Sequence, residues 1–191
     1  MIPKILHAVW LGGDMPPQLV AFLKTVRDKN PLWSHILWTE ETIRLILGME
    51  AVGLRVESPA SKSNWFRLSV LHRFGGIYLD ADCECFQPLD MLCVHGAFAA
   101  LQDGERVCNA VMGAEPESGW IGWQLQHWED FDQNDPASGV YLATAAPREL
   151  VTIIPTELVY PFSYDDPPEK RFPDHSKSLL AHWWSGSWVK P

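Results

Sequence analysis

Two carboxylates stand one residue apart directly after an apolar run, and they are the residues of this chain best suited to chemistry. Asp80 and Asp82 follow the stretch 75–79, Gly-Gly-Ile-Tyr-Leu. In an extended backbone, residues i and i+2 share a face, so both carboxylates can converge on one cation while Ala81 and Cys83 turn inward. Oxygen ligands of this kind suit Mg²⁺ or Mn²⁺. The pair therefore predicts a divalent-metal site.

A solvated strand end is the alternative interpretation of such a pair, because an Asp-x-Asp triplet also occurs there by chance. A calcium loop of the EF-hand type is excluded. With Asp80 as its first position, Cys85 stands where glycine is needed and Met91 where the bidentate glutamate belongs. The segment before the aspartates supports the metal site.

That segment is predicted to be one helix over 58–74 that delivers the chain to the carboxylates. Ser58 is a helix-start signal, and Pro59 fits the first turn. The pair Gly75-Gly76 then allows a left-handed stop and a sharp turn into a short strand over 77–79. The order helix, double glycine, strand, carboxylates is more specific than the aspartate pair alone.

Asn64 and Arg67 lie three residues apart, so they share one face of this helix. Phe66 and Val70 belong to a different, apolar face. Arg67 could be a surface cation whose stem packs on its neighbours. Beside the aspartates, a contact with a phosphate or a sugar is the better interpretation.

The first fifty residues predict a parallel sheet. Strands and helices alternate there, which is typical of such sheets: strand 4–10, a helix opened by Pro16-Pro17, strand 35–38 and helix 39–48. Parallel sheets bind ligands beyond the carboxyl ends of their strands. Trp10 and the carboxylates at 80 and 82 are therefore expected to meet at one crevice.

The second half predicts shorter elements. We expect strands over 97–102, 110–114 and 152–160, helices over 120–131 and 140–146, and an exposed loop over 160–174. Pro155 restricts the last strand to an edge or a bent piece, because proline cannot donate to a sheet.

Composition sets the class of protein. The 191 residues are 47% hydrophobic, enough for one domain with a sizeable core. A net charge of −9 argues against nucleic acid or an anionic membrane as a broad partner. No apolar run is long enough to span a bilayer, and the N-terminus shows no secretory leader.

The four cysteines show no paired Cys-x-x-Cys spacing, which argues against a structural zinc site. They are Cys83, Cys85, Cys93 and Cys108. Cys83 and Cys85 alternate with the acidic residues and should point into the fold as reduced thiols. A cytoplasmic location would permit this.

Three segments carry a family resemblance: Ile2 to Gly12 (IPKILHAVWLG), 63–67 (SNWFR) and 75–82 (GGIYLDAD). Together they resemble the DXD-containing sugar transferases of glycosyltransferase family 32, and they are similar to the catalytic domain of the large bacterial glucosylating toxins. The resemblance implies an α/β fold of the GT-A type, with a Rossmann-like, mostly parallel sheet flanked by helices. It implies a single compact domain over 1–191, with a nucleotide-sugar and metal half over 1–95 and an acceptor-side half over 96–191.

The resemblance also assigns roles around the metal. It implies Asp82 as a direct ligand and Asp80 as a ligand through water or a ribose contact. Arg67 would offset developing negative charge, and Trp10 would stack on the base. His182 could complete the metal site as a neutral imidazole, although a histidine beside tryptophans is also common in protein cores.

Three further donor contacts follow from the resemblance: Asn109, Ser187 and Trp188 are expected to face the nucleotide sugar. A turn role is the alternative for Asn109. Asn64 stands where the family usually has an aspartate that touches the donor sugar. An amide can bind hydroxyls but carries no charge and cannot act as a base, so donor preference could differ or turnover could be low.

The sequence thus predicts a metal-dependent glycosyltransferase. It would use Mn²⁺ or Mg²⁺ and a UDP- or GDP-linked sugar, and would act on a saccharide or glycolipid acceptor in polysaccharide or glycoconjugate biosynthesis. Retention of configuration is the family precedent, and no covalent nucleophile stands out among Glu84, Asp103, Glu115 and Glu117. Two alternatives stay open: a non-catalytic sugar or nucleotide binding module, and a metal-dependent nucleotide-sugar hydrolase.

Overall fold

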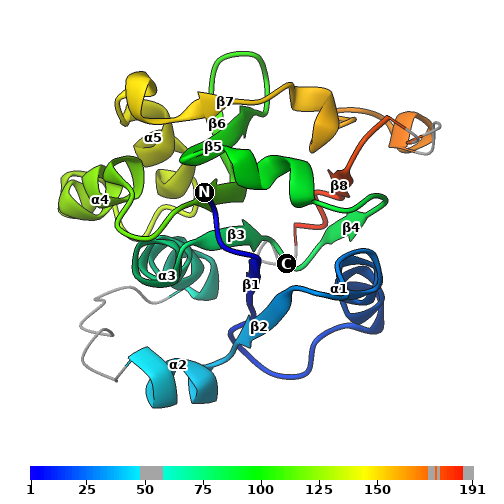
Figure 1. The fold of residues 1–191 in the computed structure, drawn as a ribbon, viewed down its shortest axis with the longest axis horizontal. Helices are drawn as coiled ribbons and strands as arrows, with labels where there is room; N and C mark the ends of the chain where they lie inside the picture. Colours follow the sequence, from blue (N-terminus) through cyan, green and yellow to red (C-terminus); the bar gives the residue numbers. More distant parts are fainter. Residues whose placement is uncertain (48–57, 172–174, 176, 187–191) are drawn as a thin grey trace.

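The computed structural model describes residues 1–47, 58–171, 175 and 177–186. A central six-stranded sheet runs through it, with helices on both sides (Figure 1). Its strands, in spatial order, are β2 (Ser34–Trp38), β1 (Ile5–Val9), β3 (Gly76–Leu79), β6 (Val107–Ala114), β5 (Ala97–Leu101) and β7 (Thr152–Ile153). A separate two-stranded antiparallel sheet joins β4 (Cys83–Cys85) to β8 (Leu180–His182).

Three of the five strand pairings in the central sheet are parallel, which confirms the mostly parallel GT-A-type sheet. β1 pairs in parallel with both β2 and β3, and β5 pairs in parallel with β7. β6 runs antiparallel to β3 on one side and to β5 on the other. The pairings among β1, β2 and β3 are thus parallel, as the sequence predicted for the N-terminal part, and β5–β7 adds a parallel pair at the other edge.

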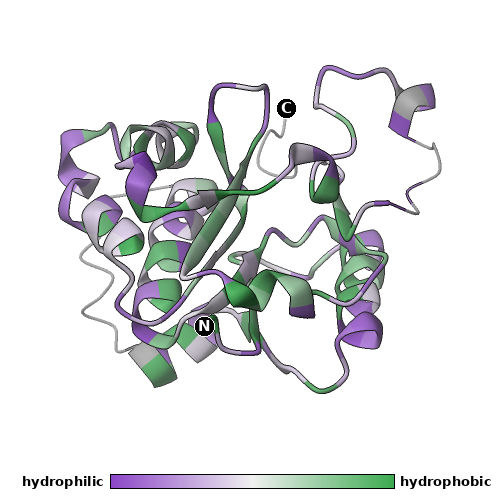
Figure 2. Ribbon diagram, turned by 45° about the horizontal axis from the view of Figure 1, so that its top comes forward, coloured by the Kyte–Doolittle hydropathy of each residue, from purple (hydrophilic) through white to green (hydrophobic). Residues whose placement is uncertain are grey.

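Within the described ranges, five α-helices surround the sheet: α1 (Pro17–Lys29), α2 (Glu40–Leu47), α3 (Pro59–Phe74), α4 (Gly119–Gln126) and α5 (Ser138–Ala145). Alternate residues of each strand face opposite layers. Tyr78 packs in the layer with α3, α4 and α5, whereas Ile77 and Leu79 pack in the layer that holds Val26 of α1 and the small sheet. Figure 2 shows hydrophobic residues concentrated in the central strands and hydrophilic ones on the outer helices and loops.

The turn from α3 into β3 requires both of its glycines. Gly75 and Gly76 have φ values of +64° and +102°, where other residues are strained. Added Cβ atoms would lie 2.6 Å from Pro116 Cδ and 2.5 Å from the Ile5 carbonyl oxygen, respectively. At the other end of α3, the Ser58 hydroxyl accepts a hydrogen bond from the Ser61 backbone N–H, as the start signal predicted.

Two predicted elements in the second half differ from the structure. The helix expected over 120–131 ends at Gln126 and is followed by a separate 3-10 turn, η3 (Trp128–Asp130). The strand expected over 152–160 is wrong beyond Ile153: β7 is a two-residue edge strand, and a 3-10 turn, η5 (Thr156–Leu158), follows Pro155. Proline donates no hydrogen bond, so the strand cannot continue through it.

The part of the chain that the structure describes also contains the 3-10 helices η2 (Asp90–Val94), η4 (Arg148–Leu150) and η6 (Pro168–Arg171). Cys83, Cys85, Cys93 and Cys108 are buried free thiols, as expected for Cys83 and Cys85. None of the helices in the described ranges is long and apolar enough to cross a bilayer.

Candidate metal centre

The fold brings the sequence-predicted residues to one edge of the sheet. Trp10 and Asp80 come directly after β1 and β3, which are parallel neighbours, so both lie at the carboxyl ends of their strands. β4 then pairs with β8 so that Cys83 stands opposite His182. This pairing carries a histidine from the far end of the chain to the aspartates.

Asp80 is held through one of its two carboxylate oxygens. The Tyr78 hydroxyl donates to Oδ1 at 2.7 Å, and Arg67 Nη2 lies 3.2 Å from the same oxygen. Tyr78 and Asp80 are two residues apart, so the alternation of the strand places both on one face. The second oxygen, Oδ2, is turned toward His182.

Asp82 is anchored in the same manner from the opposite side. Its Oδ2 accepts hydrogen bonds from the backbone N–H and the hydroxyl of Ser185, both at 2.8 Å. The second oxygen, Oδ1, lies 3.0 Å from His182 Nε2, while Asp80 Oδ2 lies 3.8 Å from that nitrogen. Each carboxylate therefore has one fixed oxygen and one that faces the imidazole.

These three residues fit a divalent cation. Each offers one ligand atom, and the three atoms lie within 4.8 Å of one another. Mg–O bonds are about 2.1 Å long, so two oxygen ligands of one ion lie up to about 4.2 Å apart. Two carboxylates and an imidazole of Asp80, Asp82 and His182 are a donor set that Mn²⁺ or Mg²⁺ accepts, so the cluster would need only a small contraction.

Asp82 and His182 shift each other's pKa in the absence of a cation. Burial would raise the pKa of Asp82, but the charge of His182 and the hydrogen bonds from His182 and Ser185 outweigh it and hold the pKa well below its usual range. Burial would lower the pKa of His182, and the charge of Asp82 reverses the direction, so the pKa is raised. His182 Nδ1 has no hydrogen-bond partner in the part of the chain that the structure describes, and its ring packs against Trp184 at 4.2 Å.

Arg67 lies behind Asp80, inside the protein. Its side chain is 7% exposed, and all three guanidinium nitrogens have protein partners. Nε donates to the Ser63 carbonyl at 3.3 Å, Nη1 donates to the Asn109 carbonyl at 2.6 Å, and Nη2 pairs with Asp80. The guanidinium also lies 4.6 Å from the centre of the Tyr78 ring. These contacts position Asp80, and the expected phosphate role of Arg67 stays a prediction.

Asn64 and Asn109 are bonded to each other. Asn109 Nδ2 donates to Asn64 Oδ1 at 2.9 Å, and Asn64 Nδ2 donates to the Pro136 carbonyl at 3.0 Å. Gly139 of α5 packs directly on the pair, since an added Cβ would lie 2.1 Å from Asn109 Nδ2. The two amides thus connect α3 and β6 to the start of α5. Their expected contacts with the nucleotide sugar stay predictions.

Trp10 packs on a small apolar cluster next to the aspartates. Its indole N–H donates to the Gly13 carbonyl at 2.9 Å, and its half-buried ring packs against the cluster of Leu19, Phe22 and Ala81, as Trp183 also does. Ala81 separates the two aspartates in sequence, so Trp10 borders the site. Ser187 and Trp188 lie outside the described residues, and their role stays a prediction.

Sequence reasoning did not single out Tyr78 or Ser185. The alternation of β3 is a signal that could have found Tyr78, whereas Ser185 reaches Asp82 only through the β4–β8 pairing. Among the possible nucleophiles, Asp103 pairs with Arg106, and Glu115 pairs with the N-terminal amine.

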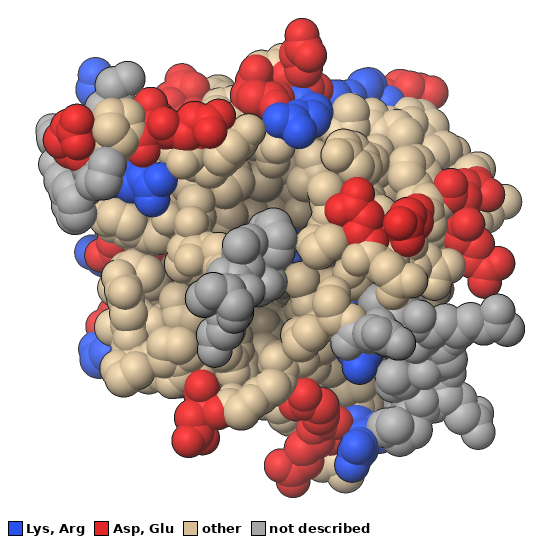
Figure 3. All heavy atoms as spheres, turned by 180° about the vertical axis from the view of Figure 1, so that it is seen from behind, with Lys and Arg blue, Asp and Glu red and all other residues tan. Residues whose placement is uncertain are grey.

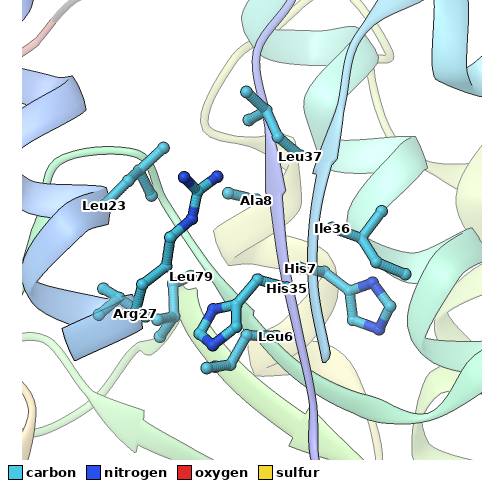
Figure 4. A pocket seen from close by; sticks show the side chains of 10 residues that line it. Leu6, His7, Ala8, Leu23, Arg27, His35, Ile36, Leu37 and Leu79 are labelled. Carbon is cyan, nitrogen blue, oxygen red and sulfur yellow. The ribbon is translucent and has the colours of Figure 1, made fainter. Parts of the chain in front are cut away.

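The surface and the interior each show a further feature. Figure 3 shows a hollow near the middle of the face seen from behind, with acidic side chains scattered over the surrounding surface. The cavity in Figure 4 has a volume of about 30 Å³ and lies between α1 and the strands β1 and β2. It is lined by Leu6, Leu23, Arg27, His35 and Leu37, among others. Room for about one water makes it a packing defect and not a sugar site.

A sheet of this topology that ends in paired aspartates and a facing histidine defines a GT-A-type protein with a DXD motif. Residues 16–99 match the family described as "Glycosyltransferase sugar-binding region containing DXD motif". This match confirms the predicted resemblance to DXD-containing glycosyltransferases over that segment of the chain.

Two curated relatives extend this match. The chain is 29% identical over 117 residues to Inositol phosphoceramide mannosyltransferase 3 of Schizosaccharomyces pombe, covering 59% of this chain and 33% of that protein. It is 32% identical over 121 residues to Mannosyl phosphorylinositol ceramide synthase CSH1 of Saccharomyces cerevisiae, covering 61% of this chain and 32% of that protein. The chain thus spans about a third of the length of these relatives.

A solved structure supports the fold. A glycosyltransferase involved in the glycosylation of the major capsid of PBCV-1 superposes with a TM-score of 0.56 at 11% identity, covering 97% of this chain and 95% of that one. At this identity the likeness concerns the fold alone.

Proposed function

We propose that this chain transfers a sugar, with Mn²⁺ or Mg²⁺ bound, from a nucleoside-diphosphate sugar to a saccharide or glycolipid acceptor. One observation carries the proposal: Asp80 and Asp82 each have one oxygen fixed by protein donors and the other turned toward His182. Such preorganisation serves a cation better than it serves a solvated strand end. The names of the two relatives favour mannose as the sugar.

Each residue of the site is proposed to have a separate role. A divalent cation held by Asp80, Asp82 and His182 would stabilise the negative charge of the departing diphosphate. Arg67 keeps Asp80 oriented and compensates its charge in a buried place. Trp10 offers its ring to the nucleobase. Retention of configuration is proposed from the family precedent.

Nucleoside diphosphate release is the direct test. The purified chain is incubated with GDP-mannose, UDP-glucose or UDP-galactose, with Mn²⁺, Mg²⁺ or EDTA and a panel of methyl glycosides. We expect release only with metal, and a loss of at least a hundredfold in Asp82→Asn. Asp28→Asn is the matched control, because that exposed carboxylate pairs with Lys24 of the same helix. Release that survives both EDTA and Asp82→Asn would refute the proposal.

A binding module is the second candidate function. Asn64 favours it, because this amide replaces the usual aspartate and both of its polar atoms are used within the protein. The thermal stability of the protein should then rise with nucleotide and Mn²⁺, while no donor is cleaved with any acceptor. A hydrolase would instead cleave the donor at a rate that acceptors do not change.

A further inference from the structure

The residues after β8 adopt a strained backbone beside the metal centre. Trp184 has φ = +52°, an unusual value for a bulky side chain. This conformation lets Ser185 reach Asp82 with two hydrogen bonds while the Trp184 ring packs on His182. Strain of this kind persists where the surrounding contacts fix it, and it is concentrated at functional sites.

Trp183 and Trp184 have different partners around this segment. The Trp183 ring is stacked on Phe22 of α1, with centroids 5.7 Å apart and planes at 5°, and its centroid also lies 5.3 Å from that of Phe162. The Trp184 indole N–H donates to the Phe162 carbonyl at 3.0 Å, in the segment that leads into η6. In Figure 1, β8 lies between α1 and this orange segment. Trp10, which packs on the same apolar cluster as Trp183, is proposed for the base, so the side of Trp184 that meets Tyr164 is left for another ligand.

Tyr164 extends the Trp184 side to the surface. Its ring meets Trp184 edge to face, with centroids 5.8 Å apart, and the residue is 46% exposed. Arg171 holds it in place: Nη2 donates to the Tyr164 carbonyl at 3.0 Å, and Nη1 donates to the Trp183 carbonyl at 3.4 Å. Arg106 also bonds the Tyr164 side chain, and Trp184 contacts both this exposed ring and His182.

We propose that Tyr164 and Trp184 form a binding platform for a pyranose ring of the acceptor. A pyranose has an apolar C–H face that packs on aromatic rings and hydroxyls that need polar partners, and a tyrosine offers a ring with a polar tip. Asp165, an exposed neighbour, supplies an acceptor for hydroxyls. This platform rests on the proposed function, since it assigns the acceptor side of the same site.

The test separates acceptor binding from donor cleavage. In transfer to methyl α-D-mannopyranoside, or to whichever methyl glycoside of the panel is accepted, we expect Tyr164→Ala to raise the acceptor KM about tenfold. Tyr164→Phe should stay within about twofold, because the ring makes the contact. Acceptor-free release of nucleoside diphosphate should not change in either variant. Tyr141→Ala is the matched control: it removes another tyrosine, 45% exposed, from α5.

Two results would overturn the platform. One is an unchanged acceptor KM in Tyr164→Ala; the other is an equal loss of acceptor-free release, which would mark a general structural defect. If the wild type cleaves no donor, the proposed function fails, but saturation-transfer NMR with the same methyl glycosides still tests the platform. Contact signals that are lost in Tyr164→Ala and kept in Tyr141→Ala would support it, and no signals with the wild type would refute it.

Discussion

His7 makes the stability of this protein sensitive to acid. The residue is 1% exposed, and both ring nitrogens are used. The Trp38 indole N–H, which can only donate, lies 3.0 Å from Nδ1, so Nε2 carries the proton and donates to the Gly75 carbonyl at 2.8 Å. A second proton on Nδ1 would face the indole N–H. The folded protein therefore requires the neutral imidazole.

Burial lowers the pKa of His7 to about 4, even though the bond to the Gly75 carbonyl raises it. In the unfolded chain the pKa is about 6.5. Above pH 6.5 the imidazole is neutral in both states and contributes no pH dependence. Between pH 6.5 and 4 the unfolded chain binds more protons, so the free energy of unfolding falls by about 3 kcal/mol as the pH falls.

Urea unfolding at pH 4 to 7 measures this effect against His7→Gln, whose amide can still donate to the Gly75 carbonyl. The variant should be less stable at pH 7, and the difference in unfolding free energy from wild type should shrink by about 3 kcal/mol on going to pH 4. Comparing the two proteins cancels the titration of the other groups. Val9→Ala, a buried substitution on the same strand, controls for destabilisation alone. Parallel pH profiles of wild type and His7→Gln would refute the reasoning.

Two further predictions concern the neighbourhood of the aspartates. Asn64→Asp restores the usual family residue. It should lower the free energy of unfolding in urea by about 2 kcal/mol or more, because a carboxylate cannot donate to the Pro136 carbonyl. A gain in turnover without this loss of stability would contradict the prediction. Ser185→Ala removes the hydroxyl that fixes Asp82 and should weaken Mn²⁺ binding about tenfold in a titration followed by calorimetry, and an unchanged Kd would contradict it.

The sequence alone was sufficient for the N-terminal half and the metal motif. The helix over 58–74, the double glycine and the strand before Asp80 each carry a local signal, because backbone conformation there depends on neighbouring residues. The alternation of strands and helices predicted the parallel sheet, and hence that Trp10 and Asp80 follow neighbouring strands at one edge of it. Local rules succeed where the structure is determined by residues close in sequence.

Only the tertiary structure decided which partners orient those residues. The β4–β8 pairing brings His182 and Ser185 to Asp82 across about a hundred residues, and no local pattern encodes that register. Arg67 was expected beside the aspartates, but its pairing with Asp80 and its bonds to the Ser63 and Asn109 carbonyls are visible only in the fold. Such contacts depend on long-range packing, because a side chain has many possible partners until the fold selects among them.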